Sequence, residues 1–144
     1  MGKKNKKINT ILGIVLAIVV AVAIFGCIYV AKKSVKSNLN EIVEELNKQV
    51  PVRIDDDTRM IKAKLTDSNT LKYTFDLINL DTKAAKLRFT DPEKNLLKKR
   101  IVDNLKNNVQ SDFFKKNKIN FDYTYRSNSG EELFTIEVSY KDYK

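Results

Sequence analysis

The sequence has no histidine and only one cysteine, and these absences narrow the chemistry available to it. Without histidine the chain cannot build a Ser-His-Asp or Cys-His catalytic centre, an HExxH zinc site or a histidine-based pH switch. Cys27 has no cysteine partner, so the folded part must be held together by packing and not by an intramolecular disulfide. A glycine-rich phosphate loop is also missing. We therefore predict no catalytic residues, no metal site and no cofactor, and expect that the protein is not an enzyme.

Charge is absent from one long stretch, which runs from Ile11 to Ala31. Of its 21 residues, 13 are Ile, Leu, Val or Phe. As a helix it would reach about 31 Å, close to the thickness of the hydrocarbon core of a bilayer. A helix that is apolar all round needs protein on every side in a soluble core, and the rest of the chain is too small to surround it. The stretch therefore predicts a single transmembrane helix at residues 11–31.

The flanking charges predict how this helix is oriented. Four lysines precede the span within residues 1–10 and three follow it within residues 32–36, so the positive-inside bias is small and favours a cytoplasmic N-terminus. We expect a single-pass protein of the bacterial plasma (inner) membrane, with its C-terminal domain extracytoplasmic. Gly26-Cys27 also allows a lipoprotein reading, in which Cys27 is acylated. The bulky Phe25 and the apolar run beyond Cys27 favour the retained anchor.

Small residues recur every fourth position within the predicted span, at Gly13, Ala17 and Ala21. They would form one stripe along which two helices could approach closely, so a homodimer is one hypothesis. In the alternative the stripe simply faces lipid.

The remaining residues are enough for one small domain. Apolar spacing predicts an amphipathic helix over residues 32–50 that leads into a domain at residues 51–144. Asp91-Pro92-Glu93 predicts the start of a helix that runs to Val109, and Ser111-Asp112 predicts a shorter helix after it. Alternating apolar residues predict four strands, at residues 60–66, 71–77, 119–125 and 134–140. Residues 81–90 are ambiguous between strand and helix.

This order predicts the fold class. Two strands, then helices, then two strands indicate an α+β domain with an antiparallel sheet of about four strands, packed against two or three helices. With the anchor, the whole chain is a transmembrane helix followed by this domain.

Several short segments together resemble a known family. They are Leu46-Asn47-Lys48-Gln49-Val50-Pro51, Asp55, Asp57-Thr58-Arg59, Leu71-Lys72-Tyr73 and Tyr123-Thr124-Tyr125-Arg126 leading into Gly130. The chain from about Leu39 to its end is similar to a family of small exported α+β proteins of bacteria, many of them membrane-anchored or lipidated. The resemblance implies a cysteine pair in many members, which this chain lacks, with Gln110 near one of the two positions. It implies no activity, because the family has no assigned function.

Two groups of residues in the domain are candidates for contact with a partner. One helix face is basic, and it could meet a partner or an anionic surface; a solvated face is the alternative. Its residues are Lys94, Lys98, Lys99, Arg100 and Lys106. The second group is a possible recognition surface, although tyrosines at strand alternation are more often core residues. Its residues are Asp55, Thr58, Arg59, Tyr73 and Tyr125.

Two further alternatives concern the run Asp55-Asp56-Asp57-Thr58 and the function class. The run could hold a cation with oxygen ligands, but it lacks the spacing of a calcium loop, so a polar turn leading into the next strand is favoured. As a whole the sequence favours a non-catalytic binding or scaffold protein with an unknown protein partner; nucleic acid is not the expected partner. The alternative is an enzyme that acts on a cell-envelope component and uses Asp with Tyr or Lys. A pilin-like subunit ranks last, because the Gly-Phe processing site is missing.

Overall fold

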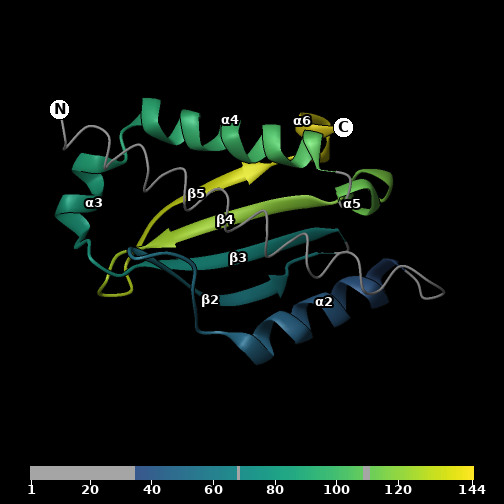
Figure 1. Cartoon of the computed structure of the whole chain (residues 1–144), viewed down its shortest axis with the longest axis horizontal. Coiled ribbons are helices and arrows are strands. Elements are labelled where there is room, and N and C mark those ends of the chain that lie inside the picture. Colours follow the sequence, from purple (N-terminus) through teal and green to yellow (C-terminus); the bar gives the residue numbers. More distant parts are fainter. Residues whose placement is uncertain (1–34, 68, 109–110) are drawn as a thin grey trace.

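A twisted five-stranded sheet forms the centre of the structure (Figure 1). The computed structural model describes residues 35–67, 69–108 and 111–144. The strands lie in the spatial order β1-β2-β3-β4-β5, which is also their order along the chain. Their bounds are β1 Val52–Arg53, β2 Thr58–Leu65, β3 Thr70–Leu77, β4 Asn120–Arg126 and β5 Glu132–Val138.

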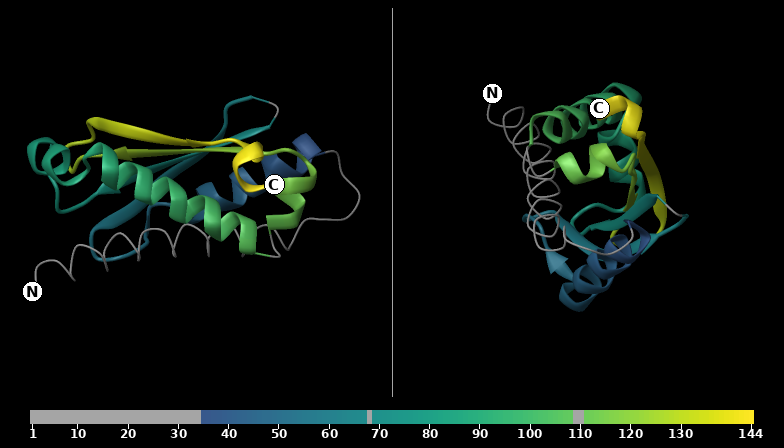
Figure 2. Two further views of the ribbon diagram at one scale, coloured as in Figure 1. Left: turned by 90° about the horizontal axis from the view of Figure 1, so that it is seen from above. Right: turned by 90° about the vertical axis from the view of Figure 1, so that its right-hand side faces the viewer.

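Five helices in the described part of the chain accompany this sheet. α2 runs along the β2 side, while α4 and α6 lie at the β5 side (Figures 1 and 2). Their bounds are α2 Val35–Gln49, α3 Thr82–Arg88, α4 Asp91–Asn107, α5 Asp112–Lys116 and α6 Tyr140–Tyr143. The predicted α+β class and the helices after Asp91 and Asp112 are therefore confirmed, and the ambiguous residues 81–90 contain α3.

One face of the sheet carries the core, because apolar side chains alternate along the strands and meet the apolar stripes of the helices. Leu39, Ile42 and Leu46 of α2 are buried in the same cluster as Leu97, Ile101 and Leu105 of α4. The strands contribute alternate residues to this cluster, except in β2, where the register shifts between Met60 and Lys62. These are Met60, Ala63, Leu71, Tyr73, Phe75, Leu77, Phe121, Tyr123, Tyr125, Ile136 and Val138.

Local capping fixes where the helices begin. Asp81 accepts a hydrogen bond from the backbone nitrogen of Ala84 at 2.7 Å and so starts α3. The N-cap of α4 is Thr90, one residue before the expected Asp91, and its backbone nitrogen donates to the carboxylate of Glu93 at 3.4 Å. Pro92 then occupies the first turn, where its missing N–H costs no hydrogen bond.

The prediction of an antiparallel sheet of about four strands is wrong in two respects. β3 and β4 pair in parallel, and β1 adds a fifth strand of two residues. The sheet is therefore mixed, because α3, α4 and α5 carry the chain back to the end of the sheet where β3 began, and parallel neighbours need such a crossover. Strand alternation does not contain this information. The last predicted strand is also too long at its end, since Ser139 ends it by capping α6, where its backbone nitrogen donates to Asp142 at 2.9 Å.

The predicted anchor at residues 11–31 lies outside the described residues, as do Cys27 and the stripe of Gly13, Ala17 and Ala21. Among residues 35–67, 69–108 and 111–144, no helix is long and apolar enough to cross a membrane.

Candidate functional site

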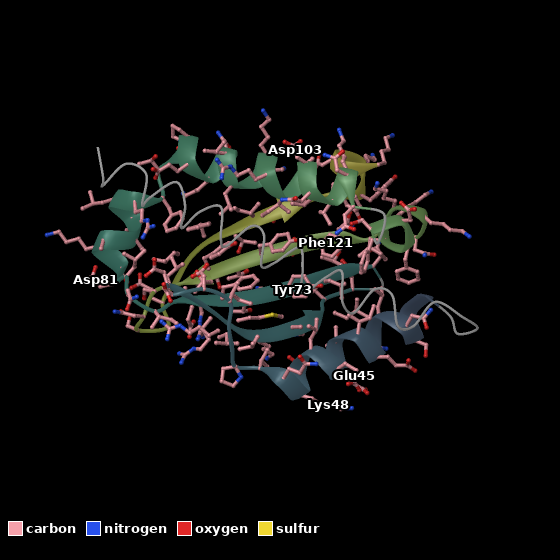
Figure 3. The ribbon with its side chains drawn as sticks, in the orientation of Figure 1. Glu45, Lys48, Tyr73, Asp81, Asp103 and Phe121 are labelled. Atoms are coloured by element: carbon pink, nitrogen blue, oxygen red, sulfur yellow. The ribbon has the colours of Figure 1, made fainter. Side chains whose placement is uncertain are left out.

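The two tyrosines of the expected recognition surface lie inside the domain. Tyr73 is 2% exposed and Tyr125 is fully buried. Tyr73 stacks on Phe121 of the neighbouring strand with 6.2 Å between ring centroids, and both are at the centre of the sheet in Figure 3. Burial raises the pKa of both tyrosine hydroxyls above the ordinary value. These rings therefore hold the sheet to its helices, which was the alternative that strand alternation favoured.

Asp55, Thr58 and Tyr125 form a polar corner at one end of the sheet, which we call the Asp55 corner. Asp55 Oδ1 accepts a hydrogen bond from the backbone nitrogen of Asp57 at 2.8 Å, so the acidic run is a turn that leads into β2. Asp55 Oδ2, Thr58 Oγ1 and the Tyr125 hydroxyl are buried without a hydrogen bond of good geometry among the described residues, although the Thr58 hydroxyl is close enough to Asp55 to lower the pKa of that carboxyl. Burial raises the pKa of Asp55, and the Asp55 charge adds to the raised pKa of Tyr125.

Arg59, the last of the five expected recognition residues, belongs to an ionic row across the opposite face of the sheet. No helix of the described residues covers this face (Figure 2), and we call it the helix-free face. Arg59, Asp76 and Arg126 are neighbours in register on β2, β3 and β4. Arg126 Nε donates to Asp76 Oδ1 at 2.7 Å, and Arg59 Nη2 lies 3.5 Å from Asp76 Oδ2. The hydrogen bond to Asp76 raises the pKa of Arg126. Sequence reasoning missed Asp76, although its place on the polar side of the β3 alternation could have pointed to it.

β2 has little free edge, although β1 beyond it is itself an end strand of two residues. β1 covers its beginning, where Val52 pairs with Met60 and Arg53 with Arg59. Further along, the side-chain amide of Asn47 on α2 takes the place of a neighbouring strand: Asn47 Nδ2 donates to the Ala63 carbonyl at 2.8 Å, and the Ala63 nitrogen donates to Asn47 Oδ1 at 2.9 Å. Unpaired edge groups invite pairing with another chain, and this contact removes two of them.

The β5 edge is open by comparison. Within the described residues β5 pairs on one side only, with β4. Beside it lies a groove of about 490 Å³, which we call the α4–β5 groove. Its lining residues are Asp91, Lys94, Asn95 and Lys98 of α4 and Thr135, Ile136 and Glu137 of β5. Side chains alternate between the two faces of a strand, so three consecutive residues line one groove only when the strand presents its edge to it.

The expected basic face of α4 is divided by this groove. Lys94 and Lys98 line it, whereas Lys99 and Lys106 are exposed to solvent and Arg100 is half-buried. The Lys94 ammonium lies 5.5 Å from the centre of the Phe134 ring on β5 and 3.5 Å from Asp91. Lys98 lies 3.6 Å from Asp142 of α6. Each pair is exposed and its atoms are well separated, so neither contact holds its lysine strongly.

In the described residues, no group of three or more Cys, Asp or Glu side chains is arranged to hold a metal ion. Two other candidate sites in the described residues are the buried Asp55 corner and the open α4–β5 groove. The groove combines unpaired strand backbone with two lysines of α4 and the carboxylates of Asp91 and Glu137, and a strand edge of this kind can bind an extended chain.

The fold is similar to those of three solved bacterial proteins. A candidate secreted protein from Pseudomonas aeruginosa aligns with a TM-score of 0.61 and 10% identity over 76% of this chain and 93% of that chain. The type 2 secretion pilotin EpsS from Vibrio vulnificus aligns with a TM-score of 0.56 and 11% identity over 76% and 92% of the two chains. The pilotin AspS from Vibrio cholerae gives 0.53 and 13% over 75% and 91%. At such low identity these likenesses describe the fold alone.

At the level of sequence, no curated protein matches the chain significantly. The family model described as "Domain of unknown function (DUF8479)" matches residues 33–134, which include α2 and extend into β5. This match covers most of the chain and agrees with the resemblance to a functionally unassigned family. The chain therefore belongs to the family of this domain of unknown function.

Proposed function

We propose that the protein is a non-catalytic binding module, which is held at the outer face of the bacterial inner membrane by residues 11–31 and binds another protein of the envelope. The observation that carries this proposal is the difference between the two edges of the sheet. β1 and Asn47 cover much of the β2 edge and leave only the two residues of β1 as an end strand, whereas all of β5 is an end strand and borders the α4–β5 groove. Folded proteins protect free edges, so an unprotected edge beside a groove is a natural place for a partner.

Two further observations support the proposal. The uncharged stretch at residues 11–31 has the length and hydropathy of a membrane anchor. Two of the proteins with a similar fold are described as pilotins of type 2 secretion systems, which suggests that this fold suits a part in an envelope assembly.

The test is crosslinking in intact cells with the tagged full-length chain, followed by mass spectrometry of what is captured. We expect one envelope protein to be enriched over a control. The control protein has the same tag and the same anchor, residues 11–31, joined to an unrelated domain. Extraction with alkaline carbonate should leave the protein in the membrane fraction. Capture of no partner, together with an unchanged envelope in a deletion strain, would contradict the binding function.

The alternative, an enzyme acting on a cell-envelope component, would have to use the Asp55 corner. Its raised Asp55 pKa and its unpartnered hydroxyl groups are what an acid–base site can present. The burial of these oxygens instead favours a structural role. An Asp55→Asn variant that complements a deletion strain as well as the wild type would support the binding module, and a folded but inactive variant would favour the enzyme.

A further inference from the structure

The α4–β5 groove has two walls of different kinds. One wall is the unpaired edge of β5 at Thr135, Ile136 and Glu137, and the other is the start of α4 with Asp91, Lys94, Asn95 and Lys98. A strand edge gives main-chain hydrogen bonds to an added strand and no sequence preference, because every peptide has the same backbone. A helix beside the edge supplies the preference through its side chains.

We infer that this groove binds an extended segment of a partner protein as an added strand next to β5, and that the segment carries acidic residues at every second position. This inference rests on the proposed binding function and names the chemistry of its partner. The segment would pair through its backbone with β5, and its acidic side chains would meet the lysines of α4.

The spacing of the lysines fixes the pattern of acidic residues. Lys94 and Lys98 are four residues apart on α4, which places them about 6 Å apart along the helix axis. Residues two apart in an extended strand lie on the same face about 6.6 Å from each other. An acidic residue, any residue, and a second acidic residue can therefore contact Lys94 and Lys98 together.

The other side of the added strand has a different requirement. Glu137 is exposed and belongs to the helix-free face, opposite the core face to which Ile136 points. An acidic residue next to Glu137 would be repelled, so the residues between the acidic ones should be neutral or basic. A segment with alternating acidic and neutral residues can thus place its acidic side chains against the α4 lysines and its neutral side chains beside Glu137. Shifted by one residue, the same segment would place its acidic side chains beside Glu137 and lose the contacts to the lysines.

Both lysines are available for such a contact. Their present partners, Asp91 and Asp142, are 3.5 and 3.6 Å away, at the long end for an ion pair. The side chain of Asp91 is 93% exposed, so it can return to water at little cost.

The first measurement is binding of a fluorescent eight-residue peptide, with aspartate and threonine alternating, to the full-length chain in mild detergent. We expect saturable binding, which becomes about tenfold weaker in Lys94→Ala/Lys98→Ala, because two exposed charge contacts are lost. The matched control is Lys62→Ala/Lys64→Ala on β2, which should bind as the wild type does. A peptide with alternate backbone nitrogens methylated, so that it cannot pair as a strand, should lose binding.

A charge exchange keeps the test valid if the alanine variant is poorly folded. Lys94→Glu/Lys98→Glu should reject the aspartate peptide and bind the matching peptide with lysine in place of aspartate. Hydrogen exchange of the β5 amides should slow when the peptide is bound. The inference is overturned by no saturable binding, by equal binding of the methylated peptide, or by binding that ignores the lysine substitutions.

A photo-crosslinking residue introduced in cells separates this inference from the proposed function. Placed at Thr135, it should capture the envelope partner, while at Lys62 on the opposite side of the sheet it should not. Capture from Lys62 and not from Thr135 would keep the binding function and overturn the β5 site. Capture from neither position, with no partner in the general crosslinking experiment, would overturn both.

Discussion

Replacing Asn47 with alanine tests how the β2 edge is closed. The variant loses two hydrogen bonds to the backbone of Ala63, of 2.8 and 2.9 Å. Each such bond contributes about 1 kcal/mol net, so the loss is about 2 kcal/mol. Alanine is the better helix former, and in the last turn of α2 it returns about 0.5 kcal/mol. We therefore expect the free energy of unfolding to fall by about 1.5 kcal/mol.

The assay is urea unfolding followed by far-ultraviolet circular dichroism, since the chain has no tryptophan to report the transition. With a slope of about 1.5 kcal/mol per molar urea for a domain of this size, the midpoint should move down by about 1 M. The matched control is Gln49→Ala, an exposed position in the same turn of α2, which should change the midpoint little. Equal midpoints for the two variants would refute the edge closure.

An Asn47→Asp variant adds a pH dependence to the same test. Its carboxylate can still accept from the Ala63 nitrogen, but its second oxygen would face the Ala63 carbonyl at the place of the present 2.8 Å bond. The protonated form can donate there, so the folded state should raise the pKa of the new carboxyl group. The variant should then gain stability relative to the wild type as the pH falls below about 5. A constant difference between the two proteins from pH 7 to 4 would contradict this arrangement.

Four further substitutions test the interior and the helix-free face of the sheet. Tyr125→Phe removes a buried hydroxyl without a partner among the described residues and should be neutral or stabilising by about 1 kcal/mol. Tyr143→Phe removes a hydroxyl bonded to a backbone carbonyl and should lower the free energy of unfolding by about 1 kcal/mol. Equal urea midpoints for the two variants would refute this difference between the two hydroxyls. Burial raises the Asp55 pKa in the folded state above its unfolded value, so the charged carboxylate destabilises the fold once the pH rises above these two pKa values. Asp55→Asn should therefore stabilise the protein at pH 7. In urea titrations this gain in stability should vanish below about pH 4, and a gain that persists there would contradict the predicted sign. Asp76→Ala leaves Arg126 without its 2.7 Å acceptor and should lower the free energy of unfolding by about 2 kcal/mol. High salt should not mimic this loss, because Asp76 is only 8% exposed.

Local patterns in the sequence predicted most of the elements. The four expected strands lie within about two residues of β2, β3, β4 and β5, because period-2 alternation follows directly from which side chains meet the core. The helix at Asp91-Pro92-Glu93 was equally readable, since its cap and proline act within one turn. The same alternation favoured a core role for Tyr73 and Tyr125, and both are buried.

The missed features all depend on contacts between distant residues. The parallel pairing of β3 and β4 depends on the direction in which the crossover returns, and two residues of β1 are too short for a pattern. The hydrogen bonds between Asn47 and Ala63 join residues 16 apart in the chain, and no periodic sequence pattern predicts them. For the same reason the basic residues of α4 could be identified as a helix face, but not divided into those at the groove and those in solvent.

The sequence by itself determined which chemistry the side chains can provide and which residues avoid water. It has no histidine and one cysteine, an uncharged stretch at residues 11–31, and alternations that separate core from surface. These are properties of single residues and of their near neighbours. The tertiary structure alone decided which backbone groups remain without a strand partner. That depends on which strands become neighbours and on whether a side chain such as Asn47 reaches an edge, and it is why the closed β2 edge and the open β5 edge appear only in the folded chain.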